Sequence, residues 1–304
     1  MSGTSTAGVS TAGVSTASQP HASDSKRRGA WLQRMRIGDW MYVGFLCAVV
    51  VLIAFGPLLA PYSATEFHPL HALQAPGQQF PFGADEFGRD VFSRIIIGAR
   101  PTLLLAIAAA ALGVLLGSTT GMIAGYSGGA LDEILMRAMD VLMSFPALIL
   151  AMLMVVMMGP AAVNVIAAIG IVFWPRSARL VRSVVMDLTQ REFIAAARSR
   201  GESWLFIVAR ELLPNVLMII VVDFSLRVTS AILLAAALAY LGIGVSPPTP
   251  AWGLMVRDGQ QLIELAPWLV IFPCAAIAIV SVGAMLLGER LRRAINLPGG
   301  ERAR

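Results

Sequence analysis

The sequence predicts an all-α integral membrane protein with six transmembrane helices. Of its 304 residues, 57% are hydrophobic and 13% are charged, and the mean hydropathy is +0.74. Soluble domains typically carry about 25% charged residues, so this composition lies outside their range. Apolar runs of about 20 residues recur along the chain, and each is long enough to cross a bilayer as a helix. Helices are expected because hydrocarbon offers no partners for an open backbone.

The chain begins with a low-complexity tail. The sequence TAGVS occurs at Thr6–Ser10 and again at Thr11–Ser15. Small and polar residues of this kind bury too little surface to fold, so we expect residues 1–36 to be a cytosolic and largely disordered tail. No apolar core follows within the first 25 residues, which argues against a secretory signal.

A transmembrane domain is expected over residues 37–287, followed by a cytosolic tail at 288–304. The charge-free block from Val141 to Pro175 is too long for one crossing, and Gly159-Pro160 divides it, since proline interrupts the helical ladder and glycine permits a turn. The predicted spans lie near residues 41–60, 101–125, 141–158, 161–175, 216–242 and 267–287.

The positive charges predict the orientation. With the N-terminus inside, the inner segments hold 18 of the 23 Lys and Arg residues. The outer segments hold Arg89, Arg94, Arg100 and Arg257, and Arg227 lies within a span. Lys and Arg are concentrated in cytosolic loops of membrane proteins, so both termini and the charged segment 191–215 are expected in the cytosol.

The segment 191–215 is predicted to be a short helix outside the membrane, linked rigidly to the next span. Helix formers run from Arg191 to Arg200, and Gly201 stands where a left-handed residue would close that helix. A second apolar helix, from Trp204 to Leu213, then runs through Pro214 into the fifth span. Small alanines allow close approach by a soluble partner. The alternative is an amphipathic helix that rests on anionic headgroups.

Asp223 and Arg227 are predicted to lie near mid-membrane in the fifth span. They stand about 14 and 20 Å along the helix from Pro214 at 1.5 Å per residue. Charges at that depth normally face a cavity or a partner, and the i,i+4 spacing lets the two neutralise each other. Two interpretations stay open: the pair lines a translocation path, or it is a structural ion pair at a subunit contact.

The sequence contains no catalytic or metal-binding constellation. The histidines, His21, His68 and His71, stand in the tail or the first outer loop without ligand spacing. Cys47 and Cys274 lie in separate apolar runs and are interpreted as inert thiols. No basic patch is interleaved with aromatic residues, so nucleic-acid binding is not expected.

The run from Ala195 to Asn215, AAARSRGESWLFIVARELLPN, resembles the EAA loop of the permease subunits of bacterial ABC importers. That motif reads Glu-Ala-Ala, three residues, Gly, nine residues, Ile, one residue, Leu-Pro. The residues in register are Ala196, Ala197, Gly201, Leu213 and Pro214, and the departures are Ala195 in place of Glu and Glu211 in place of Ile.

Three further stretches are similar to the dipeptide and oligopeptide branch of this family. FGADEFGRDVFSRIIIGAR, from Phe82 to Arg100, resembles its Gly-Thr-Asp, two residues, Gly-Arg-Asp signature, with Ala84 in place of Thr. Tyr240–Gly253 and Leu287–Gly299 resemble its outer loop and its C-terminal end. The resemblance covers roughly residues 30 to 300, in family order.

The resemblance implies a type I ABC importer permease fold in a bacterial cytoplasmic membrane. It implies a second homologous permease subunit, two ATPase subunits that grip the EAA helix, and an extracytoplasmic peptide-binding protein. ATP and Mg would be bound by the ATPases. This agrees with the residues, because a P-loop requires a lysine and the chain's lysine, Lys26, stands in the tail.

The outer signature, Gly83, Asp85, Gly88, Arg89 and Asp90, is expected to be mainly structural. It reads as a turn and a helix start, with Asp85 as the cap and Arg89 solvated. Contact with a substrate-delivering protein or with the partner permease is the alternative. Trp252, after the proline-rich stretch SPPTPAW, is expected at the membrane interface.

The family implies peptides as cargo, with nickel or another small solute as the alternative. A different class, an ion-coupled secondary transporter, would favour inverted repeats and several intramembrane ionisable groups, whereas one compensated pair is found here. A channel or a scaffold protein is the third class of function considered.

Overall fold

The computed structural model describes residues 37–244 and 247–296, with side chains from residue 44 to residue 293. The chain divides into two compact units, Met1–Val43 and Gly44–Arg304. Within the first unit only residues 37–43 are described, as the start of a helix. The predicted disordered tail at 1–36 and the end of the predicted cytosolic tail, residues 297–304, lie outside the described residues.

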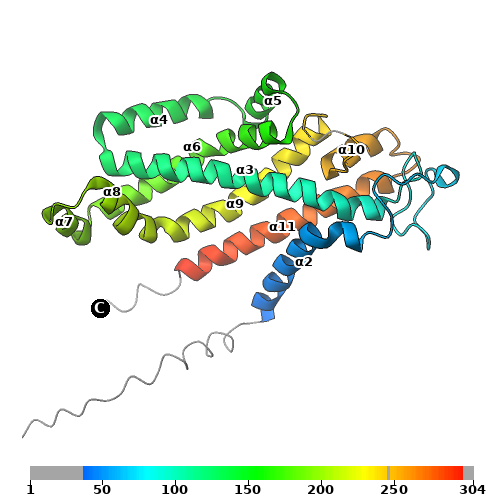
Figure 1. Ribbon diagram of the computed structural model, residues 1–304, viewed down its shortest axis with the longest axis horizontal. Coiled ribbons are helices and arrows are strands. Elements are labelled where there is room, and N and C mark those ends of the chain that lie inside the picture. The colour runs from blue at the N-terminus through cyan, green and yellow to red at the C-terminus, as the bar shows by residue number, and fades with distance from the viewer. Residues whose placement is uncertain (1–36, 245–246, 297–304) are drawn as a thin grey trace, which may run out of the picture. The chain divides into compact units, whose positions relative to one another are not determined.

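All the regular elements of the described residues are helical, as predicted (Figure 1). They are α2 (Ile37–Leu59), the 3₁₀ turn η1 (Pro69–His71), α3 (Val91–Ser127), α4 (Gly129–Met143), α5 (Ala147–Met158), α6 (Ala162–Thr189), α7 (Glu192–Ser199), α8 (Trp204–Phe206), the π-helix η2 (Ile207–Leu212), α9 (Leu213–Tyr240), α10 (Trp252–Gln260) and α11 (Trp268–Asn296).

Four helices of the described residues are long and apolar enough to cross a membrane: α3, α6, the continuous helix Trp204–Tyr240, and α11. The bent pair α4 and α5 makes a fifth if it is one span, and Gly44–Leu59 in α2 is a shorter apolar helix. The all-α membrane architecture is therefore confirmed. The count of six crossings stays a prediction.

The third predicted span, 141–158, is wrong as a single helix. α4 ends at Met143, α5 begins at Ala147, and the two are bent by 89°. Pro146 causes the break, because the residue before a proline is pushed out of the α region. Hydropathy does not predict α4 as part of a span, because the helix carries charge at Asp132, Glu133, Arg137 and Asp140.

The fourth predicted span, 161–175, is too short. α6 continues through Pro175 to Thr189. A helix needs about 20 residues to cross about 30 Å of hydrocarbon, so a crossing that starts at Ala162 reaches about residue 182. Such a crossing would include Arg176 and Arg179, which the predicted topology assigns to the inner segment; the bounds of this span stay a prediction.

α3 and α6 pack along a stripe of glycines at every fourth position of α3, Gly113, Gly117, Gly121 and Gly125. A Cβ atom at Gly117 would lie 2.9 Å from the carbonyl oxygen of Trp174 and would overlap the Cβ of Ser177. The contact also carries a hydrogen bond of 2.9 Å from Trp174 Nε1 to Thr120 Oγ1. Small residues bring helix backbones together in membranes, where water supplies no hydrophobic force between them.

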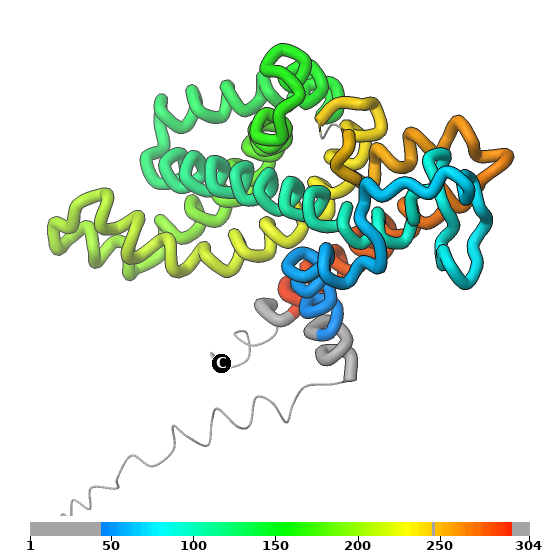
Figure 2. Tube along the Cα trace, turned by 45° about the vertical axis from the view of Figure 1, so that its right-hand side comes forward, coloured from blue at the N-terminus to red at the C-terminus, as the bar shows by residue number. Residues whose placement is uncertain are grey.

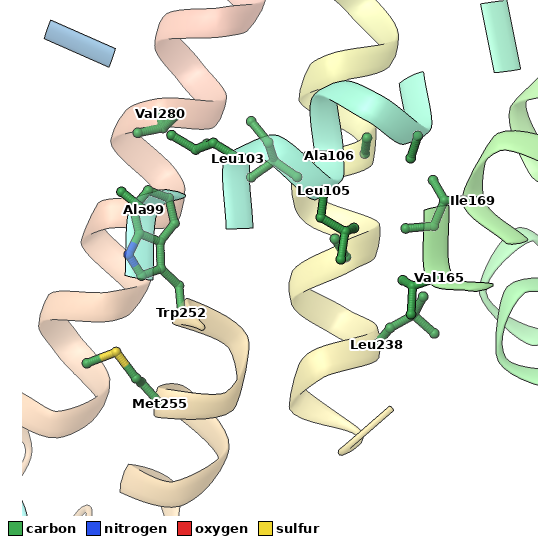
Figure 3. Packing of buried hydrophobic residues seen from close by; sticks show 14 of the residues in the cluster. Ala99, Leu103, Leu105, Ala106, Val165, Ile169, Leu238, Trp252, Met255 and Val280 are labelled. Carbon is green, nitrogen blue, oxygen red and sulfur yellow. The ribbon is translucent and has the colours of Figure 1, made fainter. Parts of the chain in front are cut away.

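The main core joins α3, α6, α9, α10 and α11 (Figure 3). Trp252 starts α10 and is 2% exposed. Its ring N–H donates to the carbonyl of Ile95 at 2.9 Å, and its backbone N–H donates to Thr102 Oγ1 at 3.4 Å. The interfacial position predicted for Trp252 is wrong, because the turn before it folds α10 back onto α3.

The α7–α8 segment and the α2–α3 loop occupy opposite ends of the Gly44–Arg304 unit (Figure 2). α10 lies at the same end as the α2–α3 loop in both views. A topology with segment 191–215 on one side of the membrane and residues 83–90 on the other requires this separation.

We predict that Gly117→Ala lowers the thermal stability of the detergent-solubilised protein. Overpacking of a tight contact typically costs about 1–3 kcal/mol. Gly44→Ala is the matched control, because a Cβ at Gly44 meets nothing within 4 Å. The expected result is a lower unfolding midpoint for the Gly117 variant and an unchanged one for the control. Equal midpoints would show that the α3–α6 contact tolerates a methyl group.

Candidate functional site

The turn after α7 has the geometry that the sequence predicts. Gly201 has φ +76°, in the left-handed region, and its N–H donates to the carbonyl of Arg198 at 2.9 Å. The next N–H, of Glu202, donates to the carbonyl of Ala197 at 3.3 Å. These two bonds form a Schellman motif, which satisfies the last carbonyls of the helix. A Cβ at Gly201 would meet nothing within 4 Å, so the backbone conformation, not space, favours glycine.

The three alanines of α7 divide between two faces. Ala197 is buried, together with Ile194, in a cluster with Val181 and Val185 of α6. Ala195 and Ala196 are exposed. Ala197 therefore brings α7 close to its own chain, whereas Ala195, Ala196 and the exposed Gly201 remain accessible to a partner.

A rigid helical connection runs from this turn into the membrane. Ser203 Oγ caps α8 by accepting from the N–H of Phe206 at 3.3 Å. The π-helix η2 follows, in which the N–H of Leu213 donates to the carbonyl of Val208. Pro214 lacks an N–H for the α-helical bond to Arg210, and the wide turn of η2 stands directly before it. The chain stays helical from Trp204 to Tyr240, as the predicted link required.

Two sets of contacts hold α7 and the turn after it to the neighbouring elements. The guanidinium of Arg198 lies 5.0 Å from the ring centroid of Tyr126 at the end of α3. Arg200 lies 3.8 Å from Glu211 and 3.6 Å from Glu202. Both ion pairs are partly exposed, so each contributes at most about 1 kcal/mol. Glu211 thus pairs across the turn at the position where the family motif has Ile.

Several exposed side chains of this segment are apolar. Trp204 is 55% exposed and Leu205 is 60% exposed, and Phe193 of α7 is also exposed. Together with Ala196 and Gly201 they form what we call the elbow surface. Trp204 and Leu205 are adjacent in sequence, and exposed large apolar side chains on an otherwise charged segment are typical of an interaction site.

Asp223 and Arg227 form the ion pair that their spacing predicts. Arg227 Nε and Nη2 both lie 3.1 Å from Asp223 Oδ1. The other oxygen, Oδ2, accepts from the hydroxyl of Ser177 in α6 at 2.5 Å. Asp223 is 2% exposed, and Arg227 lies over the ring of Phe173. Both carboxylate oxygens are occupied, and their partners tie α9 to α6. Sequence reasoning missed Ser177, since nothing in the α6 pattern marks which serine faces α9.

The outer signature is a tight turn. Asp85 Oδ1 accepts from the N–H groups of Phe87 and Arg89, each at 2.9 Å, and Oδ2 accepts from Arg89 Nε at 2.6 Å. Arg89 also stacks on the ring of Phe87 at 4.5 Å, so the expectation that it is solvated is wrong. Gly88 has φ +73°, and a Cβ there would collide with the backbone of His68.

The cap of α3 is Asp90 and not Asp85, which corrects the prediction. Asp90 Oδ2 accepts from the N–H of Ser93 at 2.9 Å and from its hydroxyl at 2.6 Å. Gly83 has φ +79° and lies against Trp268 of α11. Gly83 and Asp90 therefore join the α2–α3 loop to the start of α3 and to α11.

A charged pocket lies beside this turn. Its lining includes Glu86, Arg257, Asp258 and Gln261. The side chain of Asp258 reaches the pocket surface but is partly desolvated, and this desolvation raises the pKa of its carboxyl group. The positive charges of Arg94 and Arg257 act in the opposite direction. Among the described side chains no group of three or more His, Cys, Asp or Glu residues is arranged to hold a metal ion.

A bundle of apolar helices, with an exposed helical segment at one end and a charged turn at the other, is the architecture of an integral membrane protein. The chain matches the model of the binding-protein-dependent transport system inner membrane component over residues 117–297. This chain belongs to that family, the permease subunits of ABC importers.

Curated relatives agree with this assignment. The chain is 40% identical over 251 residues to the dipeptide transport system permease protein DppC of Alkalihalophilus pseudofirmus, which covers 83% of each chain. It is 37% identical over 271 residues to the glutathione transport system permease protein GsiD of Pectobacterium atrosepticum, covering 88% of this chain and 90% of the relative.

Solved structures support the fold. An inward-facing structure of the MetNI methionine ABC transporter matches with a TM-score of 0.56 at 18% identity, over 66% of this chain and 96% of that one. An amino acid ABC transporter matches with a TM-score of 0.52 at 17% identity, over 67% and 94%. The type I importer permease fold is therefore confirmed.

We predict that Ser177→Ala destabilises the protein, because Asp223 then keeps a buried oxygen without a donor. Loss of a hydrogen bond to a buried charged group costs about 1–3 kcal/mol. Ser183→Ala in the same helix is the control, since its exposed hydroxyl donates to the carbonyl of Leu180. Thermal unfolding in detergent measures both. A Ser177 variant as stable as the control would mean that Asp223 does not depend on this hydroxyl.

Proposed function

We propose that this chain translocates dipeptides or oligopeptides across a bacterial cytoplasmic membrane as one half of a heterodimeric pathway. The second half would be a homologous permease subunit. Two ATPase subunits would supply and bind ATP and Mg, and an extracytoplasmic protein would deliver the peptide. Support for a peptide cargo comes from the two relatives above, which are named for dipeptide and glutathione transport and span most of the chain.

The proposed coupling role rests on one structural feature. A short helix, α7, is joined by the Gly201 turn to a continuous helix that ends at Tyr240. We call this unit the lever: one face of it packs against the rest of the chain, and the other face is exposed. Ala195, Ala196, Gly201 and the exposed apolar pair Trp204 and Leu205 would meet the ATPase. The buried residues Ala197 and Leu212 would hold the lever to α6 and α3.

Leu213, Pro214 and Glu211 would act through the shape of this lever. Leu213 packs partly against the inner cluster, and Pro214 stands at the start of α9. Glu211 faces Arg200 across the turn. We propose that these residues fix the angle between α7 and α9, so that closure of the ATPases moves α9.

The role of Asp223 and Arg227 in the path stays a prediction. Their mutual pairing and the Ser177 hydrogen bond favour a structural contribution to the α6–α9 contact. The outer signature, from Gly83 to Asp90, likewise builds the turn before α3, and its exposed residues Glu86 and Phe87 would contact the delivering protein or the partner permease.

We predict that Gly201→Asp abolishes copurification of the ATPase with this chain. Aspartate tolerates φ +76° poorly compared with glycine and adds charge to the apolar elbow surface. Gly159→Asp is the control, because Gly159 also has positive φ and open surroundings but lies in the turn between α5 and α6. The control should retain the ATPase. Retention by both variants would contradict a docking role for the Gly201 turn.

A further inference from the structure

Three arginines follow one another along α6 at three-residue intervals, and two of them are neutralised by α4. Arg182 Nε and Nη2 donate to the two carboxylate oxygens of Asp132, each at 2.5 Å. Arg179 forms an ion pair with Asp140. Arg176 is exposed and, among the described side chains, has no hydrogen bond, ion pair or ring contact. Its charge is therefore uncompensated within the described part of the chain.

The break between α4 and α5 explains why Arg176 lacks a partner. α4 ends at Met143, one turn beyond Asp140, and the chain then bends by 89°. The following helix, α5, has the sequence ALILAMLMVVMM and carries no acid. The neighbouring element that pairs the first two arginines thus offers no carboxylate at the level of Arg176.

The position of Arg176 along α6 corresponds to membrane depth when the crossing begins at Ala162. It stands 14 residues, about 21 Å, from the Ala162 end of α6, inside a hydrocarbon thickness of about 30 Å. The neighbouring Ser177 bonds Asp223, which lies ten residues, about 15 Å, from the Leu213 end of α9. Crossings that begin at Ala162 and at Leu213 would both place Arg176 below the headgroups. A charge at this depth needs water or an opposite charge.

Extension of the side chain to the nearer membrane surface is an unfavourable alternative. Cα–Cβ bonds tilt toward the N-terminus of their helix, and in α6 that direction points to Ala162, the more distant surface. The geometry of the helix thus directs Arg176 away from the headgroups closest to it. An aqueous path within the transporter satisfies the guanidinium better than lipid does.

Among the arginines of α6 and α9 in the described part of the chain, Arg176 is the one without a partner, because Arg179, Arg182 and Arg227 are all paired. Asp223 compensates Arg227 and accepts from Ser177, so that site has no net charge and no vacant carboxylate oxygen. A guanidinium presents parallel N–H groups that match a carboxylate in a bidentate arrangement. The α-carboxylate at the C-terminus of a peptide has this chemistry.

We propose that Arg176 faces the translocation path and binds the C-terminal carboxylate of the peptide in transit. The inference rests on the proposed function as a peptide permease and adds a substrate contact to it. Arg179 and Arg182, which are bound to α4, would hold α6 in place and would not contact substrate.

The test is ATP-driven uptake by the complete transporter, with its second permease, ATPases and delivering protein, reconstituted in proteoliposomes. The probes are Ala-Ala and its C-terminal amide, which lacks the negative charge. The quantity compared is the uptake rate of Ala-Ala divided by the uptake rate of its amide. Any preference of the delivering protein is common to all complexes and cancels when variants are compared with the wild type.

We expect Arg176→Gln to lower this ratio by about 10-fold or more, the effect of one charge-assisted hydrogen-bonded contact. Arg176→Lys should retain much of the preference, because it keeps the charge. Arg179→Gln is the matched control. It removes an arginine one turn away and should leave the ratio unchanged.

An unchanged ratio in Arg176→Gln would overturn the inference. Loss of the second permease from the Arg176→Gln complex would also overturn it, because the partner of Arg176 would then be a carboxylate of that subunit. Absence of ATP-driven Ala-Ala uptake by the wild type would instead refute the peptide cargo, and the inference with it.

Discussion

The close contact between α3 and α6 is the constraint on which the rest of the structure depends. Four glycines of α3 let the backbones approach until an added Cβ would overlap its neighbours. In hydrocarbon, where apolar side chains gain nothing by leaving lipid, this packing holds helices together. It also sets the rotation of α6. With Gly117 against Ser177, the serine hydroxyl reaches Asp223, and Arg179 and Arg182 reach the acids of α4.

The same helix connects the membrane interior to the elbow. Val181 and Val185 of α6 contact the buried face of α7, and the Gly201 turn then leads through η2 into α9. Because α9 carries Asp223 and packs against α10, one continuous helix links the α7 end of the bundle to the α10 end. A displacement of α7 by an ATPase would therefore act on the intramembrane ion pair and on the outer end together. The chain would need no ATP site of its own to respond to ATP.

Much of this was predictable from local signals. The helix closed by Gly201 follows from a left-handed C-cap, and the Asp223–Arg227 pair follows from i,i+4 spacing, since both depend on neighbours in sequence. The burial of Trp252 could not be predicted locally, because it depends on α10 folding onto the distant helix α3. The error on Arg89 was local: its side chain bonds Asp85 and covers Phe87 within one turn, and the side-chain directions in such a turn cannot be read from the residue types. The break before α5 lies inside an apolar block, and hydropathy alone does not predict where a helix bends within such a block. The glycine stripe of α3 was visible as a four-residue repeat, but its partner helix was not.

The most direct test of this mechanism is to determine which energy source drives uptake. Proteoliposomes that hold the complete transporter can be supplied either with ATP at the ATPase side or with an imposed proton or sodium gradient, while uptake of a labelled dipeptide is measured. A permease driven through the elbow predicts uptake with ATP alone, unaffected when the ion gradients are collapsed. Uptake that follows the ion gradient and proceeds without ATP would contradict the account and favour an ion-coupled carrier.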